Sequence, residues 1–296
     1  MTQVDELIAE HEAAGRYFEA AGVRSFVREE GSGPAVVLVH GVPVSSYLYR
    51  RVIPLLAGRG FRAIAFDLPG LGLAERPEHF DYSWSGLARF MEAALDELGV
   101  ERCHLVLHDI GGPIGVEVAI RRPEQVETMT VLDTLLDVGS YRGPPAYVMR
   151  PFAVPGLGRL YLRATPRPIF TQLYYWQGIK DRAAVPRSEV HAHYDLLLRG
   201  DNGAAFLKIM RGFELGKDKE RYFREGLAAD RRPYPAQVVW GEDDPALGRK
   251  RRLAAQEFLG VTTPTLLPGK HFFQEDQAEA LAQAIGSFAS GAGSGS

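Results

Sequence analysis

The chain has 296 residues, of which 46% are hydrophobic, 24% charged and 10% aromatic. This length suits one large α/β domain or two smaller ones, and the composition excludes a disordered, collagen-like or coiled-coil protein. The formal net charge of −3 creates no field that would attract nucleic acid or an anionic membrane, so we expect neither partner.

The sequence contains no pattern that is typical of secretion or membrane insertion. It has no run of about 18 apolar residues, and acidic side chains occur throughout its N-terminal region. The single cysteine, Cys103, excludes an intramolecular disulfide framework and a multi-cysteine zinc site. These features favour a cytoplasmic protein. Residues 291–296 have the composition of a flexible linker, and we expect them to form a tail outside the fold.

Short apolar, β-branched runs recur along the chain and predict buried strands. The first, residues 35–40, reads Ala-Val-Val-Leu-Val-His and follows a Gly- and Pro-containing turn. Similar runs occur at residues 62–67, 103–108, 128–133, 236–240 and 263–267. Most of them are separated by helix-length amphipathic segments, such as residues 84–99. This alternation predicts a mostly parallel central sheet that is covered by helices on both faces.

The alternation of strands and helices stops between residues 136 and 230. This stretch lacks strand-like runs and contains many prolines and aromatic residues. The strand pattern returns at Val238, so we expect a helical insertion between two neighbouring strands, over the carboxyl end of the sheet. The predicted organisation is a core of residues 1–135 and 231–290 with a helical cap, or lid, of residues 136–230.

A nucleophile elbow is predicted where residues 103–108 run into Asp109 and then into helical sequence. Asp109 stands at the apex of this strand, turn and helix, and Gly111 and Gly112 permit the close backbone approach that the turn needs. Taken alone, the same pattern is also compatible with an aspartate that caps the following helix.

Three further positions could support chemistry at Asp109. The turn after residues 35–40 can aim the backbone N–H of Val42 at a developing oxyanion. His271 follows the last predicted strand and comes after the nucleophile and acid candidates in chain order. Asp244, after residues 236–240, is the favoured acid for His271, and Asp133 at the end of an earlier strand is the alternative.

On these residues the chain resembles the α/β-hydrolases that use an aspartate nucleophile, a group that contains haloalkane dehalogenases, fluoroacetate dehalogenases and epoxide hydrolases. The resemblance covers nearly the whole chain and is carried by three motifs, His40-Gly-Val-Pro43, His108-Asp-Ile-Gly-Gly112 and His271-Phe-Phe-Gln-Glu-Asp276. It implies an α/β-hydrolase fold, and it allows the acid at either Asp244 or Asp133.

A carboxylate is already ionised at pH 7 and suits displacement at saturated carbon, which argues against ester or amide substrates. The resemblance implies that Asp109 forms a covalent alkyl ester, which a water molecule activated by His271 then hydrolyses. The backbone N–H groups of Val42 and Ile110 would hold the resulting oxyanion. We expect no metal or organic cofactor, because the sequence has no metal-ligand spacing and no phosphate-binding loop.

Two departures from the family pattern bear on the substrate. Haloalkane dehalogenases hold the leaving halide with a tryptophan directly after the nucleophile and often with an asparagine in the first turn. The residues at those positions are Ile110 and Val42, whose side chains have no N–H donor. We therefore expect an epoxide hydrolase that converts an epoxide to a diol. The alternatives are a haloalkane dehalogenase with an atypical halide site and a ligand-binding receptor without catalysis.

The expected substrate is a small apolar electrophile, either an epoxide or a halogenated alkane, which reacts with water. Tyr174 and Trp176, in the aromatic-rich insertion, are the predicted pocket residues. The sequence is compatible with a monomer or a homodimer.

Overall fold

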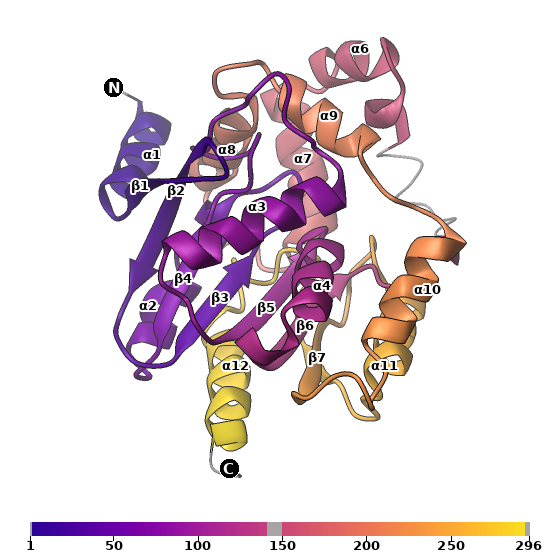
Figure 1. The fold of residues 1–296 in the computed structure, drawn as a ribbon. Coiled ribbons are helices and arrows are strands. Elements are labelled where there is room, and N and C mark those ends of the chain that lie inside the picture. The colour runs from indigo at the N-terminus through magenta and orange to yellow at the C-terminus, as the bar shows by residue number, and fades with distance from the viewer. Residues whose placement is uncertain (1, 141–149, 294–296) are drawn as a thin grey trace.

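A computed structural model describes residues 2–140 and 150–293, and an eight-stranded sheet forms the centre of this part of the chain (Figure 1). The strand order is β1-β2-β4-β3-β5-β6-β7-β8. The β1–β2 and β2–β4 pairs are antiparallel, and the other five pairs are parallel. The predicted mostly parallel sheet is therefore confirmed. The strands span Arg16–Ala20 (β1), Val23–Glu30 (β2), Ala35–Val39 (β3), Arg62–Phe66 (β4), Cys103–Asp109 (β5), Val126–Thr134 (β6), Ala236–Gly241 (β7) and Thr265–Leu267 (β8).

The central strands form where the sequence has continuous apolar runs, because both of their faces are covered. All five residues of β3 are buried, for example. β1 and β2 come before the first predicted strand and were not predicted from the sequence. In β2, exposed or partly exposed charged residues such as Arg24 and Arg28 stand beside buried apolar ones, so the segment lacks the continuous run that marked the central strands.

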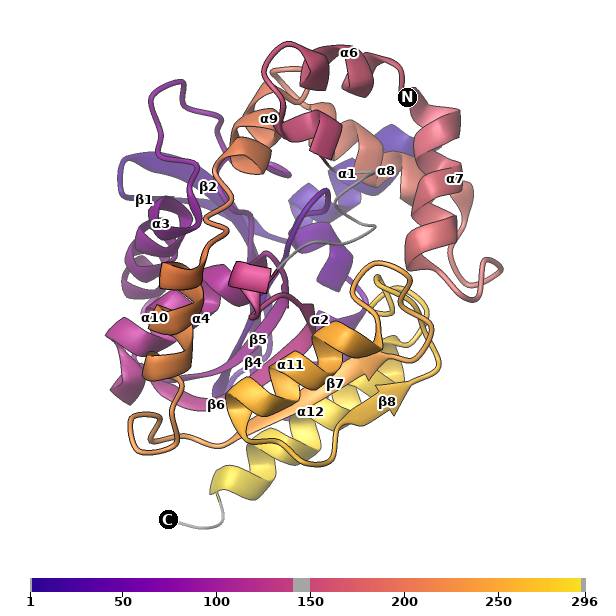
Figure 2. The ribbon, with the colours of Figure 1, turned by 90° about the vertical axis from the view of Figure 1, so that its right-hand side faces the viewer.

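Helices cover both faces of the sheet: α3 packs with α4 on one face and α2 packs with α12 on the other (Figures 1 and 2). None of the helices in the described part of the chain is long and apolar enough for a bilayer crossing. The α-helices span Gln3–Ala13 (α1), Val52–Ala57 (α2), Trp84–Glu97 (α3), Gly111–Arg121 (α4), Leu157–Arg163 (α6), Arg167–Gly178 (α7), Arg187–Leu198 (α8), Ala204–Arg211 (α9), Lys217–Gly226 (α10), Arg249–Leu259 (α11) and Ala278–Gly293 (α12), and the 3-10 helices span Ser46–Tyr49 (η1), Pro123–Gln125 (η2) and Val138–Ser140 (η3).

The C-terminal helix is longer than we predicted. α12 continues through Gly293, so residues 291–293 are helical although we expected them in a flexible tail. Leu281 and Ile285 are buried, and packing along this face stabilises the helix. Once a helix has formed, adding a further residue to its end costs little free energy. Residues 294–296 lie outside the described part of the chain.

Residues 150–230 contain helices and no strand, and the strands before and after this stretch, β6 and β7, are neighbours in the sheet. α6 to α9 lie beyond the carboxyl ends of the parallel strands (Figures 1 and 2). α10 differs from them, because it packs against α4 and η3. Residues 141–149, which also belong to the predicted insertion, lie outside the described residues.

Candidate active site

Asp109 is the last residue of β5, and its backbone has a φ of +52°. An aspartate in this left-handed region costs about 1 to 3 kcal/mol, which the surrounding structure must offset. Two glycines make the turn possible. A Cβ on Gly41 would lie 2.2 Å from Asp109 Oδ1, and a Cβ on Gly112 would lie 1.7 Å from Thr134 Oγ1. The chain therefore turns sharply here, as an elbow does, and α4 begins two residues later.

The carboxylate of Asp109 is held by the turn that follows β3. The backbone N–H of Val42 donates to Asp109 Oδ1 over 2.8 Å. Burial by itself would raise the pKa of Asp109, but a hydrogen bond and the charge from His271, together with the Val42 N–H, lower it below its usual value. Asp109 is therefore ionised at neutral pH. Ile110 follows directly as the N-terminal cap residue of α4, with its side chain buried.

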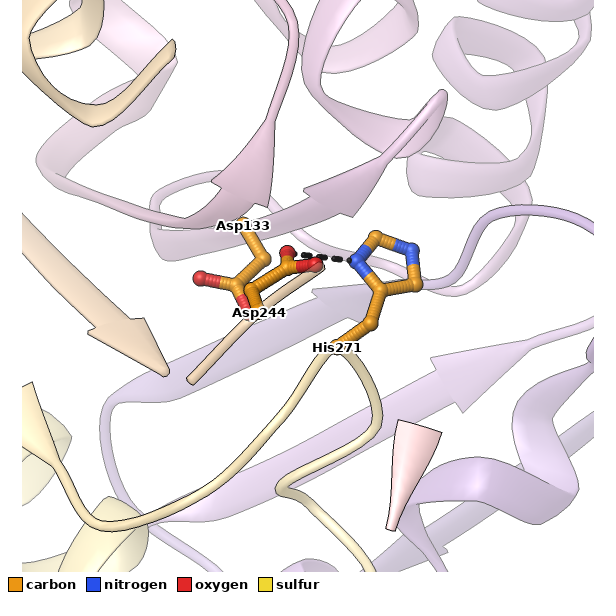
Figure 3. Close-up of side chains that lie close together, drawn as sticks. All are labelled: Asp133, Asp244 and His271. Carbon is orange, nitrogen blue, oxygen red and sulfur yellow. Dashed lines mark hydrogen bonds and ion pairs between the residues drawn. The ribbon is translucent and has the colours of Figure 1, made fainter. Parts of the chain in front are cut away.

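His271 connects Asp109 to a second carboxylate. Its Nδ1–H donates to Asp244 Oδ2 over 2.9 Å (Figure 3). Its Nε2 lies 3.6 Å from Asp109 Oδ2. The side chain of His271 is only 2% exposed. Burial would lower the pKa of His271, but the negative charges of Asp244 and Asp109 raise it well above its usual value.

Asp244 is anchored by the backbone that follows β7. Its Oδ1 accepts hydrogen bonds from the N–H groups of Ala246 (2.6 Å) and Leu247 (3.0 Å), while its Oδ2 faces His271. Burial would raise the pKa of Asp244, but the charge and the hydrogen bond of His271 lower it. Asp244 is thus a charged acceptor that orients the imidazole ring.

Asp133, the alternative acid, is close to this pair but does not bond to His271. It is fully buried near the end of β6, and its Oδ1 accepts the N–H of Gly241 over 2.9 Å. Asp133, Asp244 and His271 each offer a ligating atom within 4.8 Å of the others (Figure 3). His271 Nδ1 and Asp244 Oδ2 are separated by the length of a hydrogen bond, so His271 and Asp244 form a hydrogen-bonded histidine–carboxylate pair, and Asp133 stands beside it.

Two further histidines, His40 and His108, position the site, although the sequence predicted no role for either side chain. His40 accepts the N–H of Leu68 at Nε2 (3.0 Å) and donates from Nδ1 to the carbonyl of Gly41 (2.9 Å), which braces the turn that carries Val42. His108 donates from Nε2 to the carbonyl of His271 (2.8 Å). Both rings lie at the ends of buried strands beside motif residues, and this was the only sequence signal for them.

A cavity of about 390 Å³ opens above Asp109 and His271. Its wall is mainly apolar. Two exposed arginines, Arg150 and Arg211, are among the residues that line it. The lining residues are Val42, Pro43, Asp109, Arg150, Phe152, Ala153, Leu162, Thr165, Phe170, Leu173, Tyr174, Gln177, Leu197, Phe206, Met210, Arg211, Phe213, Leu215, Ala246, Leu247, His271 and Phe272. Both the insertion and the loops after the strands contribute to this wall.

The structure corrects one of the two predicted pocket residues. Tyr174 lines the cavity, together with Leu173 and Gln177 from the same face of α7. Trp176 does not line it, and its side chain is 54% exposed. Phe170, Leu173, Tyr174 and Gln177 recur at the spacing of one helix face and line the cavity. Trp176 adjoins Leu173 on the side of the helix away from Tyr174, so its side chain points to solvent.

Comparison with known proteins identifies the family. A model described as the α/β-hydrolase fold matches residues 34–278. The chain belongs to the α/β-hydrolase family. Haloalkane dehalogenase 2 of Mycobacterium tuberculosis is 32% identical to this α/β-hydrolase over 280 residues, which are 91% of this chain and 93% of the relative.

Solved structures show the same fold. A haloalkane dehalogenase from Bradyrhizobium elkanii superposes with a TM-score of 0.76 at 24% identity, covering 95% of this chain and 99% of that one. An epoxide hydrolase from Vigna radiata superposes with a TM-score of 0.75 at 22% identity, covering 94% and 97%. This α/β-hydrolase is therefore an enzyme of the group that contains haloalkane dehalogenases and epoxide hydrolases.

Proposed function

We propose that this α/β-hydrolase forms a covalent alkyl ester on Asp109 and hydrolyses it with water activated by His271, with Asp244 as the supporting acid. The observation that carries the proposal is the continuous Asp109–His271–Asp244 arrangement at the base of an apolar cavity. An ionised carboxylate in an apolar site is a nucleophile for saturated carbon. The expected substrate is a small apolar electrophile.

In the first step, Asp109 Oδ2 attacks a carbon that bears an epoxide oxygen or a halogen. We assign this role to Oδ2 because Oδ1 already accepts the N–H of Val42. The new C–O bond forms as the bond from carbon to the epoxide oxygen or the halogen breaks, and that atom takes the electron pair. Oδ1 becomes the carbonyl oxygen of the ester and keeps its donor.

In the second step, water attacks Cγ of Asp109 while His271 Nε2 takes a proton from it. The negative charge that develops on Oδ1 is stabilised by the N–H of Val42, with the N–H of Ile110 as the proposed second donor. Asp244 stabilises the imidazolium that forms. As the intermediate collapses, the bond from Cγ to the alkyl oxygen breaks and that oxygen takes the proton from His271 Nε2, so it leaves as the alcohol. The Asp109 carboxyl group then loses the remaining proton of the water molecule to solvent and is a carboxylate again.

An epoxide is the first candidate substrate. Opening an epoxide leaves an alkoxide, which needs a proton donor. Tyr174 lines the cavity, and its hydroxyl is buried with no hydrogen-bond partner among the described residues, so we propose it as the donor. Burial and the Glu275 carboxylate raise the pKa of Tyr174, so this hydroxyl keeps its proton. The side chains of Val42 and Ile110 cannot donate to a halide, which also supports this choice.

A halogenated alkane is the second candidate. The names of the relatives favour it, since haloalkane dehalogenase 2 of Mycobacterium tuberculosis aligns over most of the chain. A halide in this cavity could accept from the amide of Gln177, which lines it. This donor would replace the side chains that are missing at Val42 and Ile110.

We also propose a division of the chain into a core and a cap. Residues 1–135 and 231–290 would form the core, and the cap would lie within residues 136–230. Within the cap, α10 would be the helix that rests against the core, because it packs against α4, whereas α6 to α9 lie beyond the carboxyl ends of the strands.

The decisive experiment uses His271→Gln, which should stop ester hydrolysis and trap the intermediate. The variant is incubated with a panel of small epoxides and haloalkanes, its intact mass is measured, and any adduct is located by peptide mapping. A mass gain equal to a whole epoxide on Asp109 indicates epoxide opening, whereas an alkyl group without its halogen indicates dehalogenation.

Two controls make this result specific. His79→Gln changes an exposed histidine outside the cavity and should accumulate no adduct. Asp109→Asn combined with His271→Gln should accumulate none either, because the nucleophile is absent. An adduct on another residue, or no adduct with any electrophile while binding remains detectable, would count against the mechanism.

A further inference from the structure

Asp133 has a buried carboxyl oxygen that the fold does not satisfy. The residue is 0% exposed, and its backbone has a φ of +28°. Its Oδ1 accepts the N–H of Gly241, but Oδ2 has no hydrogen-bond partner among the described residues. An ionised carboxylate in this position would leave a charged oxygen buried without compensation, which proteins avoid.

The neighbouring carboxylate, Asp244, is much better compensated. It accepts two backbone N–H groups at Oδ1 and the Nδ1–H of His271 at Oδ2. Asp133 has a single donor. Two buried carboxylates at this separation repel each other when both are charged, so the proton belongs on the carboxyl with fewer donors. That carboxyl is Asp133.

We infer that Asp133 is a second acid for His271: it carries a proton while Asp244 is charged, and it ionises to support the imidazolium when Asp244 cannot. The inference rests on the proposed role of His271. It assigns the two acids different functions, with Asp244 working in the normal cycle and Asp133 as a neutral positioning residue beside it (Figure 3).

The electrostatics of the site agree with this assignment. Burial and the negative charge of Asp244 raise the pKa of Asp133 well above its usual value, and the opposing effect of His271 does not cancel them. A proton on Oδ2 also converts an unsatisfied acceptor into a donor, for which the nearby Asp244 carboxylate is the natural acceptor.

Asparagine at position 133 separates this role from a purely structural one. Its amide oxygen can accept the Gly241 N–H, and its NH₂ group imitates a protonated carboxyl, but it cannot ionise. We therefore expect Asp133→Asn alone to hydrolyse the Asp109 ester within about threefold of the unmodified enzyme. Loss of an acid that is charged in the normal cycle would lower the rate far more. For the triad aspartate of serine proteases, kcat falls about 10⁴-fold.

The test compares ester hydrolysis in single-turnover experiments on Asp133→Asn, Asp244→Asn and the double variant. We expect Asp244→Asn to be slowed about 10²-fold, because Asp133 ionises in its place, and the double variant to approach the 10⁴-fold loss of an unsupported histidine. Asp243→Asn is the matched control, since Asp243 is an exposed neighbour of Asp244 that pairs with Lys180. Equal rates for Asp244→Asn and the double variant would overturn the inference.

An infrared spectrum of the resting enzyme supplies a readout that needs no substrate. At neutral pH, Asp133→Asn should remove one carbonyl band of a protonated carboxyl group, and Asp243→Asn should remove none. If Asp133→Asn removes no such band, the inference is wrong even when the mechanism at Asp109 holds. If the band is lost but no Asp109 ester ever forms, the proposed function fails while the protonation of Asp133 stands.

Discussion

His271 lies between two carboxylates, and the proposed reaction would change the charge of only one of them. In the resting enzyme both Asp244 and Asp109 raise the pKa of His271. Esterification would neutralise Asp109, so the pKa of His271 should fall towards the value that Asp244 alone supports. The first step would thus convert the imidazole into a better base for the second.

This coupling predicts how acid should affect the two steps. The pKa of Asp109 is held below its usual value of 3.8, so the nucleophile stays ionised in mild acid. His271 in the ester gains a proton as the pH falls and then cannot activate water. Near pH 5 we expect alkylation to persist while hydrolysis slows by about tenfold or more, so that the ester accumulates.

Rapid-quench mass spectrometry across a pH series would test the coupling by following the fraction of Asp109 that is esterified. The ester fraction should rise as the pH is lowered. A fall in this fraction would mean that alkylation fails first, and that the charge distribution described for Asp109 and His271 is not the one that limits turnover.

At the scale of an element, α7 presents one face to the cavity and the opposite face to solvent. Leu173, Tyr174 and Gln177 line the cavity, whereas Trp176 is exposed. The side chains on the inner face should therefore control the size of substrate that can enter. Those on the outer face should have no such influence.

Leu173→Trp should narrow the cavity and lower kcat/KM for long substrates by about tenfold or more, with a smaller effect on the shortest ones. Trp176→Ala on the outer face of the same helix is the matched control and should leave kcat/KM within about twofold. Steady-state kinetics over a series of chain lengths would measure both. Equal effects of the two substitutions would contradict the assignment of the helix faces.

At the scale of the whole molecule, a buried charge cluster joins the insertion to the rest of the protein. Glu275, after β8, accepts two hydrogen bonds from Arg50 (2.8 and 2.7 Å) and one from His193 on α8 (2.7 Å). Glu189, also on α8, accepts from Arg50 and Arg51. Burial alone would raise the pKa of Glu275, but Arg50 and His193 lower it from 4.5 to about 2.

This shift makes stability depend on pH. The pKa of Glu275 is lower in the folded protein than in the unfolded chain, so its charge stabilises the fold above about pH 4.5, and that contribution is lost as the pH falls towards 2. Glu275→Gln should lower the free energy of unfolding at pH 7 by about 3 to 5 kcal/mol, because it breaks the buried Arg50–Glu275 ion pair and removes one of the two carboxylates that Arg50 contacts. It should also weaken the loss of stability in acid.

Denaturant unfolding at several pH values would measure both effects. Glu279→Gln is the control, since Glu279 is exposed on α12 and pairs with Arg59 at the surface. We expect this control to change the free energy of unfolding by less than about 1 kcal/mol. A Glu275→Gln variant as stable as the control would show that the cluster does not tie the insertion to the core.

The sequence by itself determined the features that depend on local order. Continuous apolar runs predicted the central strands, because burial on both faces demands them, and the glycines after Asp109 predicted its sharp turn. The resemblance of three short motifs was enough to identify the α/β-hydrolase fold. Local patterns were not enough for β1 and β2, whose charged side chains interrupt the apolar pattern.

Only the tertiary structure decided which distant side chains meet. Asp133 and Asp244 both lie near strand ends beside His271, and the sequence favoured Asp244 but left Asp133 as the alternative. The path of the backbone after β7 brings Asp244 to His271 Nδ1, whereas Asp133 is held by Gly241. The outward direction of Trp176 was settled in the same way, because the packing of α7 selects which helix face meets the cavity.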